Sequence, residues 1–69
     1  MIKSWKPLYA MYFELGIKTF SFHVADSYER RRLTSSIRTY LLNHGMDGDY
    51  KVESVDKVVN VTHKDLIFN

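Results

Sequence analysis

The chain has 69 residues, and its composition excludes several kinds of protein. It contains no cysteine, which rules out disulfides and thiolate metal sites. Five tyrosines and four phenylalanines, within a hydrophobic content of 45%, are typical of a folded domain rather than a disordered chain. We therefore expect one small domain over residues 1–69, with a limited core.

No targeting or membrane-spanning segment is visible in the sequence. The residues after the first methionine, IKSWKP, lack the long apolar run of a signal peptide. No stretch approaches the ~20 apolar residues that a transmembrane helix needs. The lack of cysteine also fits reducing surroundings, so we expect a cytoplasmic protein that does not contact a membrane.

The net charge of +2 is unevenly distributed along the chain. Residues 1–25 carry three lysines against one acid, and residues 26–44 carry four arginines against two acids. Residues 45–69 carry three lysines against five acids. This asymmetry can steer a partner, but the positive charge is less dense than on a dedicated nucleic-acid-binding surface.

Two aromatic-rich runs, at residues 8–15 (LYAMYFEL) and 17–24 (IKTFSFHV), predict a first β-hairpin. Apolar side chains recur at alternate positions, which is the period of a strand. A turn at Leu15-Gly16, or a longer loop of the same parity, sets Met11 opposite Phe20 on one face. A slip of one residue would pair apolar with polar side chains, so the pattern specifies this register.

Residues 26–45 predict a helix. Asp26 is a suitable N-cap, with Glu29 three residues later to complete a capping box. Gly45 is a natural stop. The spacing also predicts a stripe that covers the hairpin. This stripe consists of Leu33, Ile37, Tyr40, Leu41 and His44.

The last third of the chain returns to a strand pattern. The pattern predicts two strands, at residues 50–55 (YKVESV) and 58–63 (VVNVTH), joined by a turn at Asp56-Lys57. One long bent strand is an alternative. The tail, residues 66–69 (LIFN), predicts a short added strand or a plug against the core. The fold class is therefore α+β: a ββαβ(β) domain, in which one α-helix packs on one face of a three- or four-stranded antiparallel sheet. The expected core is Met11, Phe13, Phe20, Phe22, Leu33, Ile37 and Leu41.

The sequence contains no recognisable catalytic or metal-binding motif. His23, His44 and His63 share no metal-ligand spacing. There is no cysteine nucleophile, no GxSxG elbow and no glycine-rich phosphate loop. We therefore expect a chain that is not an enzyme and that binds no cofactor or metal.

The outward side of the predicted helix carries residue types common at protein interfaces. The predicted partner-binding residues are Tyr28, Arg31, Arg38 and Leu42 on this line, and Tyr12 on the sheet. The open face of the sheet should also show an apolar patch, which a monomer gains nothing from exposing. This patch consists of Leu8, Tyr12, Val55 and Val58. A protein partner is the first interpretation.

The arginine run at residues 30–32 suggests a second interpretation, a nucleic-acid-binding module that uses the basic helix. Consecutive arginines point about 100° apart on a helix, so only Arg31 and Arg38 align. Phosphate binders normally neutralise several phosphates along a continuous surface. A third alternative is a homodimeric structural or accessory protein, in which one apolar patch is closed by a second copy.

The order of these elements, with A-D-S-x-E opening the single helix, resembles small phage-encoded takeover proteins. Over residues 8–61 the layout is similar to the short inhibitor of host RNA polymerase from T7-like phages and to ββαββ anti-CRISPR proteins. The resemblance implies a non-enzymatic protein, in the host cytoplasm, that docks on a larger host complex and blocks or redirects it. It is one of layout and size, so it implies no individual functional residue.

Overall fold

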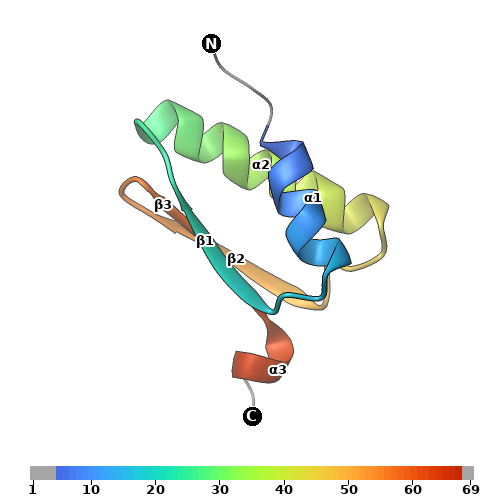
Figure 1. The fold of residues 1–69 in the computed structure, drawn as a ribbon. Helices are drawn as coiled ribbons and strands as arrows, with labels where there is room; N and C mark the ends of the chain where they lie inside the picture. The colour runs from blue at the N-terminus through green and yellow to red at the C-terminus, as the bar shows by residue number, and fades with distance from the viewer. Residues whose placement is uncertain (1–4, 68–69) are drawn as a thin grey trace.

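The computed structural model describes residues 5–67, which form a three-stranded antiparallel sheet with helices (Figure 1). The elements are α1 (Lys6–Glu14), β1 (Thr19–His23), α2 (Ser27–Asn43), β2 (Tyr50–Val55), β3 (Val58–His63) and α3 (Lys64–Ile67). The prediction of a small α+β domain with an antiparallel sheet is confirmed. The observed order, αβαββα, differs from the predicted ββαβ(β) at both ends: the first element is a helix, and the short helix α3 follows the last strand. The prediction of a single α-helix is therefore wrong.

The prediction of a strand at residues 8–15 is wrong, because α1 occupies this segment. Pro7 lies in the first helical turn, where its fixed φ is favourable and its missing N–H costs nothing. Tyr9 and Phe13 are the buried residues of α1, and Trp5 packs against the same core. Their spacing of four residues is that of one helix face. Gly16, with φ of 74°, follows the end of the helix.

The sheet has the order β1-β3-β2, so β1 pairs with the last strand rather than with the segment before it. Phe20 lies opposite Val61 and Phe22 opposite Val59. No fourth strand is present among residues 5–67. Of the tail predicted as a strand or plug, residues 66 and 67 belong to α3, and residues 68–69 lie outside the described part of the chain.

The predicted hairpin of β2 and β3 is confirmed, including its register. Val52 lies opposite Val61 and Ser54 opposite Val59. The turn is made by Asp56-Lys57, and Asp56 adopts a positive φ of 55°. This hairpin turn needs a residue with positive φ, and aspartate tolerates that conformation better than most side chains do.

The predicted ends of α2 are confirmed. The Asp26 side chain accepts a hydrogen bond from the Glu29 N–H at 2.8 Å. The Glu29 carboxylate reaches back to the N–H of Ala25, one residue before the N-cap, at 2.9 Å. Gly45 follows the helix with φ of 69°. These local interactions need no distant part of the chain, which is why the sequence predicts them well.

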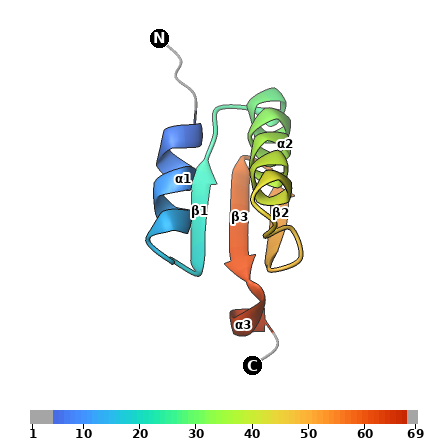
Figure 2. The ribbon, with the colours of Figure 1, turned by 90° about the vertical axis from the view of Figure 1, so that its right-hand side faces the viewer.

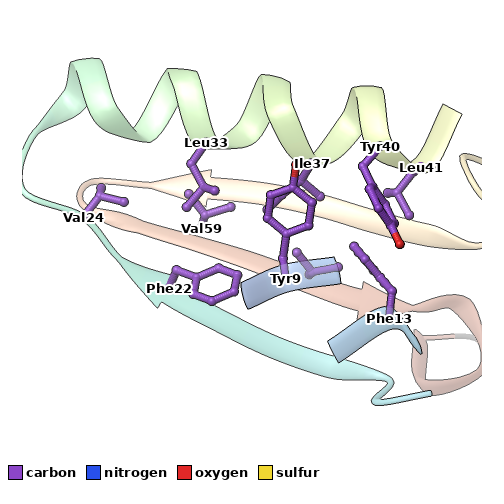
Figure 3. Packing of buried hydrophobic residues seen from close by; sticks show 10 residues of the cluster. Tyr9, Phe13, Phe22, Val24, Leu33, Ile37, Tyr40, Leu41 and Val59 are labelled. Carbon is purple, nitrogen blue, oxygen red and sulfur yellow. The ribbon is translucent and has the colours of Figure 1, made fainter. Parts of the chain in front are cut away.

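Both long helices cover the same face of the sheet, with α1 on the β1 side and α2 on the β2 side (Figures 1 and 2). The core between the helices and the sheet is aromatic where α1 meets α2. There the Phe13 ring stacks on Tyr40 with 5.3 Å between centroids (Figure 3). The buried residues are Tyr9, Phe13, Phe22, Val24, Leu33, Ile37, Tyr40, Leu41, Val59 and Val61. Of the predicted core, Phe20 is half-buried and Met11 is 45% exposed. The prediction for Met11 is wrong because it assumed a strand period where the chain is helical.

Candidate functional site

The outer line of α2, defined here as Tyr28, Arg31, Arg38 and Leu42, is exposed as predicted. Leu42 is 63% exposed and Tyr28 is 69% exposed. The buried residues of α2 lie on its opposite side. A large apolar side chain exposed beside arginines gains nothing for an isolated domain, so this line is the first candidate for a binding surface.

Most of this line borders an open groove between α2 and the edge strand β2. One end is a hollow of about 530 Å³ between Leu42 and Tyr50. The other end is a hollow of about 350 Å³ that includes Arg31 and Ser54. Arg38 borders both. The α2–β2 groove is lined by Arg31, Ser35, Arg38 and Leu42 of α2 and by Tyr50, Lys51, Val52 and Ser54 of β2.

The three consecutive arginines of α2 have three different surroundings. The Arg30 guanidinium donates a hydrogen bond to the carbonyl oxygen of Asp56 at 3.0 Å, which ties α2 to the β2–β3 turn. Arg32 lies over the Tyr28 ring at 5.7 Å from its centroid. Arg31 alone of the three combines an exposed side chain with a place in the groove. The run therefore does not form one basic stripe.

The main chain of β2 presents hydrogen-bonding groups at the free edge of the sheet. Val55 and Val58 flank the two-residue turn, so they exchange both main-chain hydrogen bonds. Bonded and non-bonded pairs alternate along an antiparallel ladder, so Glu53 and Lys51 also bond to β3. The alternate residues of β2 point their N–H and C=O groups away from β3, to the free edge. These residues are Tyr50, Val52 and Ser54.

Arg38 contacts this edge directly. Its Nη2 donates a hydrogen bond to the carbonyl oxygen of Val52 at 3.4 Å. The contact agrees with the outward direction of that carbonyl. It also places a guanidinium beside the middle of the edge, because Val52 lies in the centre of β2. The α2–β2 groove therefore combines main-chain hydrogen-bonding groups with positive charge.

The structure does not place Tyr12 on the open face of the sheet. Tyr12 belongs to α1, and its half-buried ring packs against Phe20 and Phe22 at centroid distances of 4.9 and 5.8 Å. Leu8 also lies on α1. Of the predicted apolar patch, only Val55 and Val58 lie on the sheet face that turns away from the helices. Most of their neighbours on that face are polar: Thr19, Ser21, His23, Lys51, Glu53, Asn60 and Thr62.

Tyr28 also lies apart from the groove, at the N-terminal end of α2 with Arg32. The structure thus brings together three of the five predicted partner-binding residues. These three are Arg31, Arg38 and Leu42.

Sequence reasoning missed an exposed apolar line on α1. Leu8, Met11 and Leu15 recur at helical spacing, and each is more than a third exposed. Ile17, in the loop that follows, is 36% exposed. The only signal for this line was the helical period itself, which the strand interpretation of residues 8–15 concealed.

The histidines and carboxylates of the described part of the chain form no metal-binding cluster. Among residues 5–67, no three histidine, aspartate or glutamate side chains are placed to hold a metal ion. The ring of His44 stacks on Tyr40 at 4.0 Å, and the ring of His63 contacts Asp65. A hydrogen bond from Lys18 lowers the pKa of Asp65. Burial raises the pKa of Tyr50, which lines the groove, and the nearby carboxylate of Asp49 adds to this effect.

Among residues 5–67, no helix has both the length and the apolar character needed to cross a membrane. Searches for similar proteins found no family, no curated protein and no solved structure that matches this chain.

Proposed function

We propose that this chain is a small non-enzymatic protein-binding module that docks on a larger macromolecular complex through the α2–β2 groove. The observation that carries the proposal is the exposed side chain of Leu42, which lies with Arg38 in the same hollow beside β2. Apolar and arginine side chains in one depression are typical of protein interfaces. The proposed role of the chain is that of an inhibitor or modulator of a host complex, which is the class implied by the resemblance to phage takeover proteins.

The arrangement of positive charge favours a protein partner over a nucleic acid. Arg30 is tied to the β2–β3 turn and Arg32 lies over Tyr28. In the groove, Arg31 and Arg38 remain on α2, Lys51 of β2 adds a third cation, and Asp47 offsets one of these charges. So few cations neutralise few phosphates, and a nucleic-acid surface needs a longer row.

Affinity capture from a bacterial lysate, before and after nuclease treatment, tests this proposal. We expect a partner that resists nuclease and whose yield falls at least tenfold with Leu42→Asp and with Arg31→Glu. Arg32→Glu is the matched control, since it makes the same charge change on the same helix outside the groove. Its yield should stay within twofold of the original protein.

Three results would contradict the proposal. If capture disappears with nuclease and falls steeply with salt, the chain binds nucleic acid. If Leu42→Asp and Arg31→Glu retain the partner, the groove is not the docking surface. If light scattering finds a dimer that Leu42→Asp dissociates, a second copy occupies the groove and the chain is a homodimeric accessory protein.

A further inference from the structure

The free edge of β2 is continuous with the α2–β2 groove. In the part of the chain that the structure describes, no strand lies beyond β2. An open strand edge is a template for an added strand, because its N–H and C=O groups already lie in register for one. Three residues of β2 present such groups to the edge. These are Tyr50, Val52 and Ser54, and they span a partner segment of five residues.

The side chains that flank this edge differ along its length. On the helix side, Leu42 shares a hollow with Tyr50, and Arg38 contacts the carbonyl oxygen of Val52. Arg31 lies further along, in the hollow that includes Ser54. The helix side of the edge is therefore mainly apolar at the Tyr50 end, where Asp47 adds one carboxylate, and positive at its middle and far end.

The other face of β2 has its own charge pattern. Lys51 and Glu53 lie on the face that turns away from the helices, and their side chains pair at 3.2 Å. Both side chains are exposed. An added strand would place one residue opposite each of them on that face. Opposite charges at these two positions would be favourable, and like charges unfavourable.

We propose that the edge of β2 binds an extended acidic segment of a protein partner as a fourth, antiparallel strand. Acidic residues of the segment would lie opposite Ser54 and Val52, where Arg31 and Arg38 border the groove. A third acidic residue would lie opposite Lys51, a basic residue opposite Glu53, and an apolar residue opposite Tyr50. From its N-terminus, the segment reads acidic, basic, acidic, acidic, apolar. This inference rests on the proposed function and names the partner's chemistry.

A second copy of the chain fits the same edge less well. When β2 pairs with its own copy around a two-fold axis at Val52, Lys51 of each copy lies opposite Glu53 of the other, which is favourable. The same axis brings the two Arg38 side chains together on the helix side, because each lies beside Val52. Two like charges on one axis disfavour that pairing. An acidic segment instead supplies a partner for Arg38.

A synthetic peptide tests the pairing directly. The probe is the end-blocked peptide Thr-Glu-Lys-Glu-Glu-Val-Thr, titrated into isotope-labelled full-length protein and followed by amide chemical shifts. We expect the largest shifts at Tyr50, Val52 and Ser54. The charge-reversed peptide Thr-Lys-Glu-Lys-Lys-Val-Thr should bind at least tenfold more weakly, because its lysines meet the arginines of α2.

Two N-methylated peptides form a matched pair that isolates the main-chain bonds. N-methylation of the second glutamate, opposite Val52, removes an N–H that points to β2, so the affinity should fall at least tenfold. N-methylation of the third glutamate, opposite Lys51, alters an N–H that points to solvent. The affinity should then stay within about twofold. Equal effects of the two methyl groups would overturn the proposal.

Variants of the protein provide an independent readout. Ser54→Pro removes an outward N–H without loss of a ladder bond, and proline is tolerated on edge strands. We expect a folded protein that binds the peptide at least tenfold more weakly. Arg38→Gln should also weaken binding, whereas the control Arg32→Gln should not. If Ser54→Pro does not fold, the two N-methylated peptides and Arg38→Gln still test whether the peptide binds to the edge of β2.

Other outcomes would reject the added strand. Shifts confined to α1, or equal binding of the charge-reversed peptide, would overturn it. So would a dimer whose interface protects the Val52 amide, or single-stranded DNA that shifts the same amides at lower concentration than the peptide. If Ser54→Pro still captures a protein partner that Leu42→Asp loses, the added strand is wrong while the proposed function stands.

Discussion

The hydroxyl of Tyr9 lies within hydrogen-bond distance of both the carbonyl oxygen and the hydroxyl of Ser36, and so joins α1 to α2. Tyr9 is only 1% exposed. We expect Tyr9→Phe to lower the free energy of unfolding by about 1 kcal/mol, because it leaves the half-buried polar groups of Ser36 without this partner. Tyr9→Ala should cost about 3–5 kcal/mol through the cavity it leaves. Urea denaturation measures both. The exposed Tyr28→Phe is the control, and a Tyr9→Phe protein as stable as the original would contradict the prediction.

Gly45 and Gly48 form a matched pair for backbone conformation. A Cβ added at either position would meet no atom within 4 Å, but only Gly45 has a positive φ, of 69°. Gly45→Ala should therefore lower the free energy of unfolding by about 1–2 kcal/mol, whereas Gly48→Ala should be nearly neutral. Thermal unfolding of the two variants measures the difference. Equal stabilities of the two variants would show that the C-terminal end of α2 does not depend on the left-handed conformation of Gly45.

The N-cap of α2 contributes to stability through one local hydrogen bond. Asp26→Ala removes the acceptor for the Glu29 N–H, and we expect a loss of about 1 kcal/mol in the free energy of unfolding. Asp26→Asn should retain most of the stability, since asparagine is an equally good cap. Circular dichroism during urea denaturation checks both variants. A loss of similar size in Asp26→Asn would point to charge rather than capping.

Alkaline pH should destabilise the fold through Tyr40. Burial raises the pKa of Tyr40 above its usual value of 10.0, and the nearby carboxylate of Glu14 adds to this effect. The unfolded chain therefore releases this proton at lower pH than the folded chain does. The stability contributed by the neutral phenol is complete below pH 10 and is lost as the pH rises through the folded-state pKa. Unfolding measured from pH 8 to 11 should show this loss, and Tyr40→Phe should reduce it. An equal loss in Tyr40→Phe would contradict the assignment.

The sequence predicts α2 and the β2–β3 hairpin because their signals are local. Asp26, Glu29 and Gly45 mark the ends of the helix within a few residues of where they act. The α1 segment is different, because nearly every residue from Leu8 to Leu15 is apolar or aromatic. A short run of this kind fits both a strand and a helix period. Pro7 in the first helical turn was the signal that favoured a helix.

The candidate site was predictable only in part for a similar reason. The outer line of α2 follows from helical spacing, so Arg31, Arg38 and Leu42 could be named from the sequence alone. The α2–β2 groove could not, because it depends on which strand lies at the edge of the sheet. That order, β1-β3-β2, comes from pairing between segments far apart in the chain. Hydrophobic periodicity carries no information about such pairing.

The strand order also has a consequence for how the protein is made. β1 has one neighbour in the sheet, and that neighbour is β3. While a ribosome is still translating β3, β1 and β2 have no strand to pair with, although α2 can already form. Sheet assembly must therefore wait until β3 has been synthesised. A ribosome-bound chain that stops after Val55 should resist protease no better than an unfolded one, whereas a chain extended by a linker that carries His63 out of the ribosome should be protected.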